Sequence, residues 1–396
     1  MTQRRYISVW LVLLSLALLQ AQNASAQSRM HLGKAKLVSP GVGWATVQQY
    51  PNEAPEGSSL YSTCLYWTQD NGKKWRDITP PHTSLQTLSE VFFLDSSFGW
   101  VILTETGLED NNMGFHLLST RDAGKTWVSL PVLQGTTYKL MDGMSPSEIF
   151  FSDSQHGWLV WYWHTMNSTA TSLLATADGG RTWKRLPDPP GAGPLDFTSP
   201  RDGWMVGGPE NQVGIVRLNS QLWATHDGGV RWKRAPMPVP VDSPEQGTYL
   251  ITLKFKNKRD GMLAAGVERT EGGATFRFVG CVTHDGGKTW QFYQFDALSA
   301  NPSIGDKHIF WSIFDRDTKK VAIQKDDHII PFTLPIGLFP EGRLSYADFV
   351  DDSNAWSTYF NGPAGMVLLA TSDGGKTSEI ITPPLPAQTP LLPSQH

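Results

Sequence analysis

Residues 175–186 read ATADGGRTWKRL, and almost the same word recurs along the chain as STRDAGKTWVSL, ATHDGGVRWKRA and VTHDGGKTWQFY. Aligned on its aspartate, the word follows the pattern Ser/Thr-x-Asp-x-Gly-x-Thr-Trp. Its copies are centred on Asp70, Asp122, Asp178, Asp227, Asp285 and Asp373. Recurrence at a period of roughly 50 residues indicates an array of similar structural units.

The spacing of the copies gives the number of units. Successive aspartates are separated by 52, 56, 49, 58 and 88 residues. The last separation is close to twice the others, so we expect a further unit without the word between Trp290 and Tyr346. The sequence therefore predicts seven units.

The second unit, residues 91–130, shows what one unit contains. Runs rich in apolar and β-branched residues lie at 91–94, 100–103, 115–120 and 127–130, separated by turn residues. This pattern predicts a four-stranded antiparallel meander. Such a sheet cannot bury both faces alone, and radial packing on copies of itself also protects the sheet edges. We predict an all-β, seven-bladed β-propeller over residues 27–384, with blades at about 31–80, 88–132, 145–187, 194–237, 248–293, 300–336 and 344–384.

The repeated word has a mechanical interpretation as a hairpin staple. Its aspartate is expected to accept hydrogen bonds from backbone N–H groups of the turn between strands three and four. Its glycine supplies a positive φ, and its tryptophan wedges against the next sheet. A second word, Gly-Trp, opens the second strands and supplies further core residues. It occurs at Gly43-Trp44, Gly99-Trp100, Gly157-Trp158 and Gly203-Trp204, with Gly261-Met262 and Ala355-Trp356 as variants.

The two ends of the chain differ from the repeats. Residues 1–26 combine Arg4 and Arg5, an apolar run over 9–19 and the small residues Ala24-Ser25-Ala26, which is typical of a secretory signal peptide. We therefore expect an exported protein, periplasmic or extracellular, whose mature chain does not insert into a membrane. Residues 385–396 form a proline-rich tail.

Composition excludes several classes of partner and cofactor. A net charge of −4 on 396 residues gives no general attraction to nucleic acid or anionic membranes. No His or Cys pair has zinc-site spacing, and a carboxylate held inside a hairpin is a poor cation ligand, so we expect no metal and no cofactor. Cys64 and Cys281 fall in blades one and five, which are not neighbours, and we expect two free thiols in a monomeric protein.

The six words resemble the Asp-box, or bacterial neuraminidase repeat. Together with the Gly-Trp strands, they resemble the photosystem II stability and assembly factor group of seven-bladed propellers. The resemblance covers about residues 31–384 and implies an assembly or stability role exerted on protein partners, in an envelope or membrane complex. Three departures stand out: Arg231 replaces the box threonine, Ser378 replaces the box tryptophan, and the sixth unit around residues 308–332 has no box.

Catalysis is the alternative to binding. The Arg-Ile-Pro signature of sialidases does not occur in the sequence. A glycosidase of another type needs two carboxylates about 5–10 Å apart across a cleft. Candidates follow the second strands, at Glu105, Glu109, Asp110, Glu268 and Glu271. We therefore favour a non-catalytic scaffold and keep open a carbohydrate-binding or glycoside-hydrolysing propeller.

Variable loops on a rigid scaffold are where recognition usually occurs. The box turns are short and uniform, so we expect binding at the opposite rim, which carries the loops between strands two and three and the connectors between blades. The residues expected there are Glu105, Asp110, Tyr138, Asp142, Trp163, His164, Glu268 and Arg269.

Two further segments could contribute to binding. In WLVWYWHTMN, residues 158–167, alternation sends Trp161 to the face opposite Trp158 and runs Trp163 and His164 into the loop. LKFKNKRD, residues 253–260, is a basic patch for an acidic partner or a solvated turn.

Substitution of both Trp163 and His164 by alanine is expected to weaken capture of a protein partner. The melting temperature should fall by no more than roughly a few degrees, because loop side chains contribute little to the core. Affinity capture from the native envelope, beside a thermal melt of the same variant, measures both effects. Undiminished capture would place the binding surface elsewhere.

Overall fold

The computed structural model of this chain describes residues 30–50, 62–105, 112–130, 137–139, 144–164, 169–191, 193–207, 221–236, 248–269, 275–295, 297–315, 321–330, 332–338, 342–362 and 365–383. The predicted signal peptide and the proline-rich tail lie outside these residues. In the described part of the chain, no helix has both the length and the apolar character that a membrane crossing needs.

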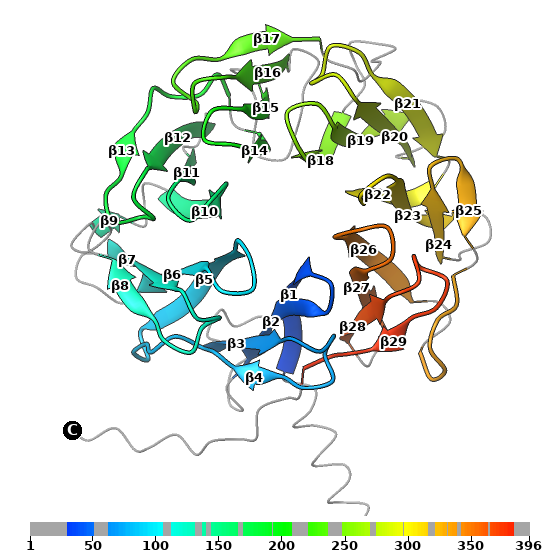
Figure 1. The fold of residues 1–396 in the computed structure, drawn as a ribbon, viewed down its shortest axis with the longest axis horizontal. Helices are drawn as coiled ribbons and strands as arrows, with labels where there is room; N and C mark the ends of the chain where they lie inside the picture. Colours follow the sequence, from blue (N-terminus) through cyan, green and yellow to red (C-terminus); the bar gives the residue numbers. More distant parts are fainter. Residues whose placement is uncertain are drawn as a thin grey trace, which may run out of the picture.

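Seven antiparallel sheets stand around a central axis (Figure 1). Each sheet follows the chain order, from the axis to the outer wall, so the prediction of seven four-stranded blades is confirmed. The innermost strands are β1 (Met30–Ser39), β5 (Gln86–Phe93), β10 (Met144–Phe151), β14 (Leu195–Phe197), β18 (Thr248–Phe255), β22 (Ala297–Ile304) and β26 (Arg343–Phe349). The second strands are β2 (Val42–Gln49), β6 (Gly99–Glu105), β11 (Gly157–His164), β15 (Gly203–Gly207), β19 (Gly261–Arg269), β23 (Ile309–Asp315) and β27 (Ala355–Phe360).

The outer half of each blade is less uniform. The third strands are β3 (Ser62–Thr68), β7 (Asn112–Thr120), β12 (Thr169–Thr176), β16 (Gln221–Thr225), β20 (Thr275–Thr283), β24 (Val321–Lys325) and β28 (Met366–Thr371). The outermost strands are β4 (Arg76–Asp77), β8 (Val128–Leu130), β13 (Lys184–Arg185), β17 (Lys233–Ala235), β21 (Gln291–Phe295), β25 (His328–Ile330) and β29 (Glu379–Ile380). Blade 2 gains a fifth strand, because β9 (Thr137–Lys139) pairs with the start of β7.

The repeated Asp-centred motif, called the box from here on, stabilises the turn between strands three and four as the sequence predicts, and blade 3 shows how. Asp178 Oδ1 accepts a hydrogen bond from the Thr182 backbone N–H at 2.9 Å, and its Oδ2 accepts one from the Thr182 hydroxyl at 2.6 Å. The Thr176 hydroxyl donates to Asp178 and accepts the Gly180 N–H at 3.0 Å. Gly179 and Gly180 have φ values of 77° and 90°, which favour glycine. The carboxylate is thus fully used inside its own turn.

The replaced threonine of box four does not break this pattern. Arg231 donates its backbone N–H to Asp227 Oδ1 and its Nε–H to Oδ2, both at 2.9 Å. The guanidinium therefore takes over the hydrogen bond that the threonine hydroxyl makes in other blades.

Box tryptophans pack on the preceding blade, which corrects the prediction that they pack on the next one. Trp127 of blade 2 lies in the core shared by blades 1 and 2, and its Nε1–H donates to the Ile78 carbonyl oxygen at 2.8 Å. Trp75 of blade 1 donates in the same way to the Ile381 oxygen of blade 7 at 2.9 Å. In both cases the acceptor directly follows the outermost strand of the preceding blade, β4 or β29.

The tryptophan of the Gly-Trp motif contacts the next blade along the chain. Trp100 of blade 2 stacks on Phe151 of blade 3 with ring centroids 3.6 Å apart, and its Nε1–H donates to the Gly179 carbonyl oxygen at 3.0 Å. Trp158 repeats both contacts one blade further on. The preceding residue must be small: a Cβ at Gly99 would lie 2.5 Å from the Phe93 ring.

The unit without a box keeps these contacts by substitution. Phe310 of blade 6 stands where five other blades have tryptophan and blade 5 has Met262, and it stacks on Phe349 at 3.8 Å. Ser378, which replaces the tryptophan of the last box, donates its hydroxyl to the Thr333 carbonyl oxygen at 3.1 Å. Phe332 and Leu334 from that same connector pack into the core between blades 6 and 7. The connector therefore fills the place of the missing indole.

Ring closure uses side chains rather than an exchanged strand. Blades 1 and 7 are each built from consecutive strands, and Trp356 Nε1–H donates to Asn71 Oδ1 at 2.9 Å across the seam. Cys64 in β3 and Cys281 in β20 are both free thiols in third strands of separate blades, as the sequence predicts.

Asp178→Ala is expected to destabilise the protein by about 1–3 kcal/mol, because the Thr182 and Thr176 donors lose their acceptor. Thermal unfolding measures the effect, with Asp188→Ala as a control on an exposed carboxylate whose removal should cost less than about 0.5 kcal/mol. An unchanged melting temperature together with lost partner capture would assign the box a functional role.

Candidate functional site

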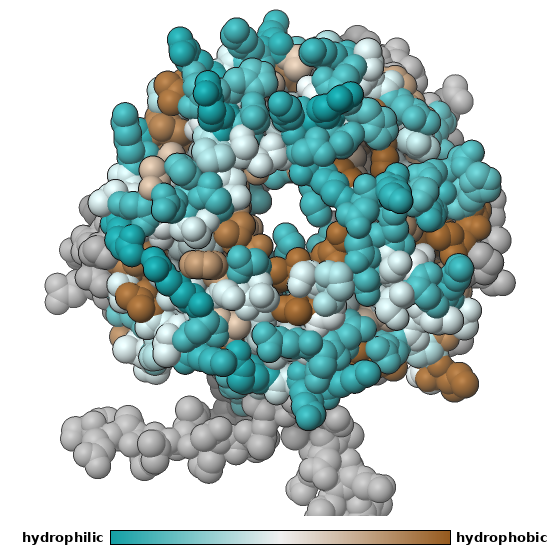
Figure 2. Space-filling view, in the orientation of Figure 1, coloured by the Kyte–Doolittle hydropathy of each residue, from teal (hydrophilic) through white to brown (hydrophobic). Residues whose placement is uncertain are grey.

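The antiparallel order gives the ring two chemically different ends. The turns between strands one and two and between strands three and four share one end, which we call the box end. The loops between strands two and three and the connectors between blades share the other, the connector end. Figure 2 shows one end of the ring as hydrophilic over most of its area, around an opening on the axis.

The residues expected to bind a partner come from three blades of the connector end. Glu105 ends β6 and Tyr138 lies in β9, at the same end of the blade 2 sheet. Trp163 and His164 end β11 in blade 3, where they pair with Ala170 and Thr169, so they belong to a strand rather than to a loop. Glu268 and Arg269 end β19 in blade 5. Asp110 and Asp142 lie outside the described residues.

Glu105 is already engaged within its blade. Its Oε2 lies 2.5 Å from His116 Nε2 and accepts a 3.4 Å hydrogen bond from Gln86. The hydrogen bond with His116 holds the pKa of Glu105 below its usual value, more than partial burial raises it. This carboxylate is therefore charged and paired, which fits a structural role better than acid catalysis.

The aromatic run of β11 serves mainly to pack the blades. Trp158 and Val160 lie in the core between blades 3 and 4, whereas Leu159 and Trp161 lie in the core between blades 2 and 3. The predicted alternation is confirmed, but both faces are buried. Trp161 is only 2% exposed and meets Phe115 edge to face at 5.0 Å, so it offers no surface to a partner.

The basic run at residues 253–260 does not form one patch. Lys254 on β18 pairs with Asp348 of blade 7 at 3.1 Å, and Lys256 pairs with Asp306 of blade 6 at 2.9 Å. Only Lys258 and Arg259 remain at the turn on the box end. Strand alternation and the radial arrangement separate these neighbours in sequence.

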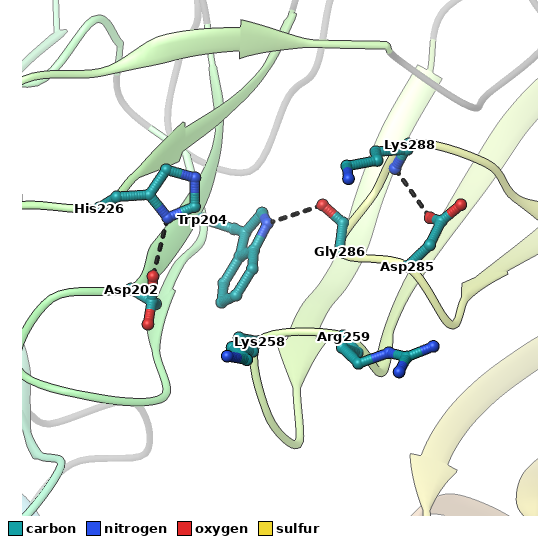
Figure 3. A pocket seen from close by; sticks show the side chains of 8 residues that line it. All are labelled: Asp202, Trp204, His226, Lys258, Arg259, Asp285, Gly286 and Lys288. Atoms are coloured by element: carbon teal, nitrogen blue, oxygen red, sulfur yellow. Dashed lines mark hydrogen bonds and ion pairs between the residues drawn. The ribbon is translucent and has the colours of Figure 1, made fainter.

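A hollow of about 480 Å³ opens at the box end between blades 4 and 5 (Figure 3). Blade 4 contributes Asp202, Trp204 and His226, and blade 5 contributes Lys258, Arg259, Asp285, Gly286 and Lys288. Trp204 joins the two blades, since it stacks on Phe255 at 3.8 Å and its Nε1–H reaches the Gly286 oxygen at 3.4 Å. The hollow is thus the gap that the inter-blade contact leaves between two box turns.

The charges of this hollow are not balanced, because its carboxylates are occupied. Asp285 accepts hydrogen bonds from both the hydroxyl and the backbone N–H of Thr289, which hold its pKa well below the usual range. Asp202 accepts hydrogen bonds from Ser199 and His226. In contrast, no ion pair of Lys258, Arg259 or Lys288 occurs among the described residues. Three cationic groups therefore surround a solvent-open hollow, which suits an anionic ligand group.

The equivalent place between blades 2 and 3 is also hollow, with a volume of about 270 Å³. It is lined by Arg121 and Arg181 but otherwise by hydroxyl and apolar side chains such as Thr126 and Val128. The repeat therefore creates the hollow, and the variable residues of each turn set its charge.

Charged side chains also gather on the inner strands, around the axis. Lys34 on β1 pairs with Glu90 on β5 at 2.9 Å, and Asp196 Oδ2 accepts the Phe255 N–H at 2.5 Å. Glu148 is an exposed residue of β10, yet its pKa is raised to about 7, first because the surrounding strands reduce the hydration of its carboxylate and second because Asp196 and Glu90 are also negative. Burial likewise raises the pKa of Asp196 to about 6. Carboxylates with raised pKa values can act as general acids.

No group of three His, Cys, Asp or Glu side chains in the described residues is placed to hold a metal ion. The six box aspartates lie in six different blades, and each accepts hydrogen bonds from its own turn. That geometry is a physical reason for their staple role.

Comparisons with known proteins give a likeness in fold alone. No family model and no curated protein match the chain. Among solved structures it is similar to YCF48 bound to a D1 peptide, at 14% identity and a TM-score of 0.45 over 75% of this chain and 81% of that one. It is also similar to YCF48 from Cyanidioschyzon merolae, at 17% identity and a TM-score of 0.43 over 76% of this chain and 86% of that one. The α-L-arabinanase of Penicillium chrysogenum complexed with arabinobiose is similar at 12% identity and a TM-score of 0.41, over 87% of this chain and 93% of that one. Likenesses this distant carry no argument about activity.

The hollow between blades 4 and 5 was not predicted from the sequence. Its residues come from four turns that are separated by up to 86 positions, from Asp202 to Lys288. A usable signal was present: Lys258 and Arg259 occupy the first turn of the same blade whose box carries Lys288. Superposing the repeats as neighbouring blades would have brought these cations together.

Glu148→Gln is expected to raise the melting temperature at about pH 8 by roughly 1–4 °C and to change it little at about pH 5. The folded-state pKa of Glu148 lies above the ordinary value, so its proton stabilises the fold below about pH 4.5, and this contribution is lost as the pH rises through 7. Thermal melts at both pH values measure the difference. Glu105→Gln is a control of opposite sign, since the pKa of Glu105 is lowered and its charged form is the stabilising one. Equal effects of Glu148→Gln at both pH values would contradict the interpretation.

Proposed function

We propose that this protein is an exported, non-catalytic propeller scaffold that binds an acidic segment of a protein partner. The observation that supports it best is the hollow between blades 4 and 5, where Lys258, Arg259 and Lys288 face solvent and the carboxylates are already engaged. Cations without a carboxylate partner at a rigid concave surface attract anionic groups of a partner and orient its approach.

The rigid frame favours binding over chemistry at this place. Lys258 and Arg259 lie in the turn before β19 and Lys288 in the turn before β21, and both turns are fixed by hydrogen bonds. Gly286 donates its N–H to the Arg259 carbonyl oxygen at 2.9 Å, which joins the two turns. Preorganised turns lower the entropy cost of holding a partner.

Assembly or stability of an envelope or membrane complex is the role that we propose for such binding. It rests on the resemblance of the six boxes and the Gly-Trp strands to the photosystem II assembly factor group. Residues 1–26 are proposed to direct export, which would place the monomeric mature chain in the periplasm or outside the cell. We propose no nucleic-acid partner, metal or cofactor.

A second candidate function is glycoside binding or hydrolysis. It is favoured by Glu148, whose pKa of about 7 suits a general acid, with Asp196 as a second carboxylate of the inner strands. The connector-end residues Trp163, His164, Glu268 and Arg269 remain a second proposed surface for either function.

Reversal of two charges tests the scaffold function. Lys258→Glu combined with Lys288→Glu is expected to reduce capture of the partner from the native envelope about tenfold, because the anion then meets like charge. Lys125→Glu combined with Lys376→Glu is the matched control, since both lysines occupy the box position of Lys288 in other blades. Capture should stay near that of the unchanged protein.

Two further measurements separate the alternatives. Capture that survives in the Lys258 and Lys288 variant but is lost on alanine substitution of Trp163 and His164 would move the binding surface to the connector end. Turnover of a glycoside by the unchanged protein, abolished in Glu148→Gln, would replace the scaffold function with catalysis.

A further inference from the structure

A histidine stands at the edge of the proposed anion site. His226 lies in the box turn of blade 4, 68% exposed, with its Nδ1 at 2.8 Å from Asp202 Oδ1. Its imidazole stands over Asp202 beside Trp204, at the wall of the hollow (Figure 3). The ring therefore belongs to the same surface as the three cations.

The hydrogen bond to Asp202 fixes how this ring takes up a proton. Asp202 is ionised, because hydrogen bonds from His226 and Ser199 hold its pKa below the usual value although burial of the carboxyl raises it. A carboxylate only accepts, so Nδ1 carries the hydrogen in the neutral ring and Nε2 is an acceptor. A second proton must go to Nε2, which turns an acceptor into an N–H donor and adds a positive charge.

The charges facing His226 come from both blades. On blade 4 they are Asp202, the neighbouring Asp227 with its partner Arg231, and Arg201, whose Nε–H donates to the His226 carbonyl oxygen at 3.3 Å. On blade 5 they are Lys258, Arg259, Asp285 and Lys288. An anion bound in the hollow would therefore meet the imidazole as well as the cations.

An equivalent histidine provides an internal comparison. His284 occupies the same box position in blade 5, is 67% exposed, and pairs with Asp260 at 2.8 Å. It does not line the hollow between blades 4 and 5. The two pairs share their geometry and the exposure of the histidine, and Arg259 Nε–H also reaches the His284 carbonyl oxygen at 3.2 Å, but only His226 lines the hollow.

We propose that His226 makes anion binding in the hollow between blades 4 and 5 dependent on pH, with the acidic segment bound more tightly when the imidazole carries its second proton. This inference rests on the proposed function, because it takes the hollow to be the docking site. Binding and proton uptake are then linked: the anion draws a proton onto Nε2, and acidification strengthens binding. Histidine ordinarily changes charge between about pH 5 and 8.

The test uses a dye-labelled oligo-aspartate peptide of about eight residues, which stays ionised throughout because the pKa of aspartate is about 3.9. Fluorescence anisotropy is measured at about pH 5.5 and about pH 8 at fixed low salt. The unchanged protein is expected to bind about five- to tenfold more tightly at the lower pH, since one charge is added close to the anion.

Two single substitutions complete the design. His226→Gln keeps a donor for Asp202 but cannot take up a proton, and it should remove most of this pH dependence. His284→Gln should retain it. Calorimetry of peptide binding in two buffers of different ionisation enthalpy should show proton uptake near pH 7 in the unchanged protein and in His284→Gln, but not in His226→Gln.

The outcomes separate this inference from the proposed function. Binding of equal strength at both pH values, or an equal loss of pH dependence in His226→Gln and His284→Gln, overturns the role of His226 and leaves the hollow as a docking site. An absence of peptide binding at both pH values overturns the hollow itself, and this inference with it. Thermal melts of both variants exclude unfolding as the cause.

Discussion

Tryptophan packing between blades is the interaction on which this ring depends. A four-stranded sheet leaves two apolar faces, and each face must be covered by a neighbour. The indole of the second strand stacks on an aromatic ring of the next blade and donates to a glycine carbonyl of that blade's box, as Trp100 does with Phe151 and Gly179. The box indole returns the contact to the preceding blade. Where both tryptophans are present, the interface is linked from both sides; between blades 5 and 6, which lack both, Met262 and Trp311 share the core instead. The blades thus hold one another in a closed ring without an exchanged strand.

The same contact shapes the surface. A glycine carbonyl can meet the neighbouring indole only if the box turn is tight, and the turn is tight because its aspartate accepts hydrogen bonds from the backbone and from hydroxyl groups. The carboxylates of the box aspartates are therefore all engaged in hydrogen bonds within their own turns. What remains at the box end are the residues next to the staple, such as Lys288 and His226, and those of the adjoining first turns. Recognition is therefore expected to depend on the positions that vary within an invariant frame.

Degenerate units keep the packing by other means. Phe310 replaces the stacked indole in the sixth blade, and Phe332 with Leu334 occupies the place of the missing box tryptophan. Arg231 supplies the hydrogen bond of an absent threonine. These substitutions conserve volume or donor geometry rather than residue type, which is why the fold persists although the first, fourth, sixth and seventh units depart from the repeated word.

Periodicity in the sequence was enough for the number of blades, their four strands, the hairpin staple and the two separate thiols, since each rests on local hydrogen bonding or on alternation along one strand. Even the opposite faces of Trp158 and Trp161 followed from alternation. The tertiary structure alone decided that Trp161 is buried, that Lys254 and Lys256 turn towards other blades, and that Lys258, Arg259, Lys288 and His226 meet around one hollow. Those outcomes depend on which turns become neighbours when the ring closes. The sequence of a single repeat unit does not determine the distances between side chains of different blades.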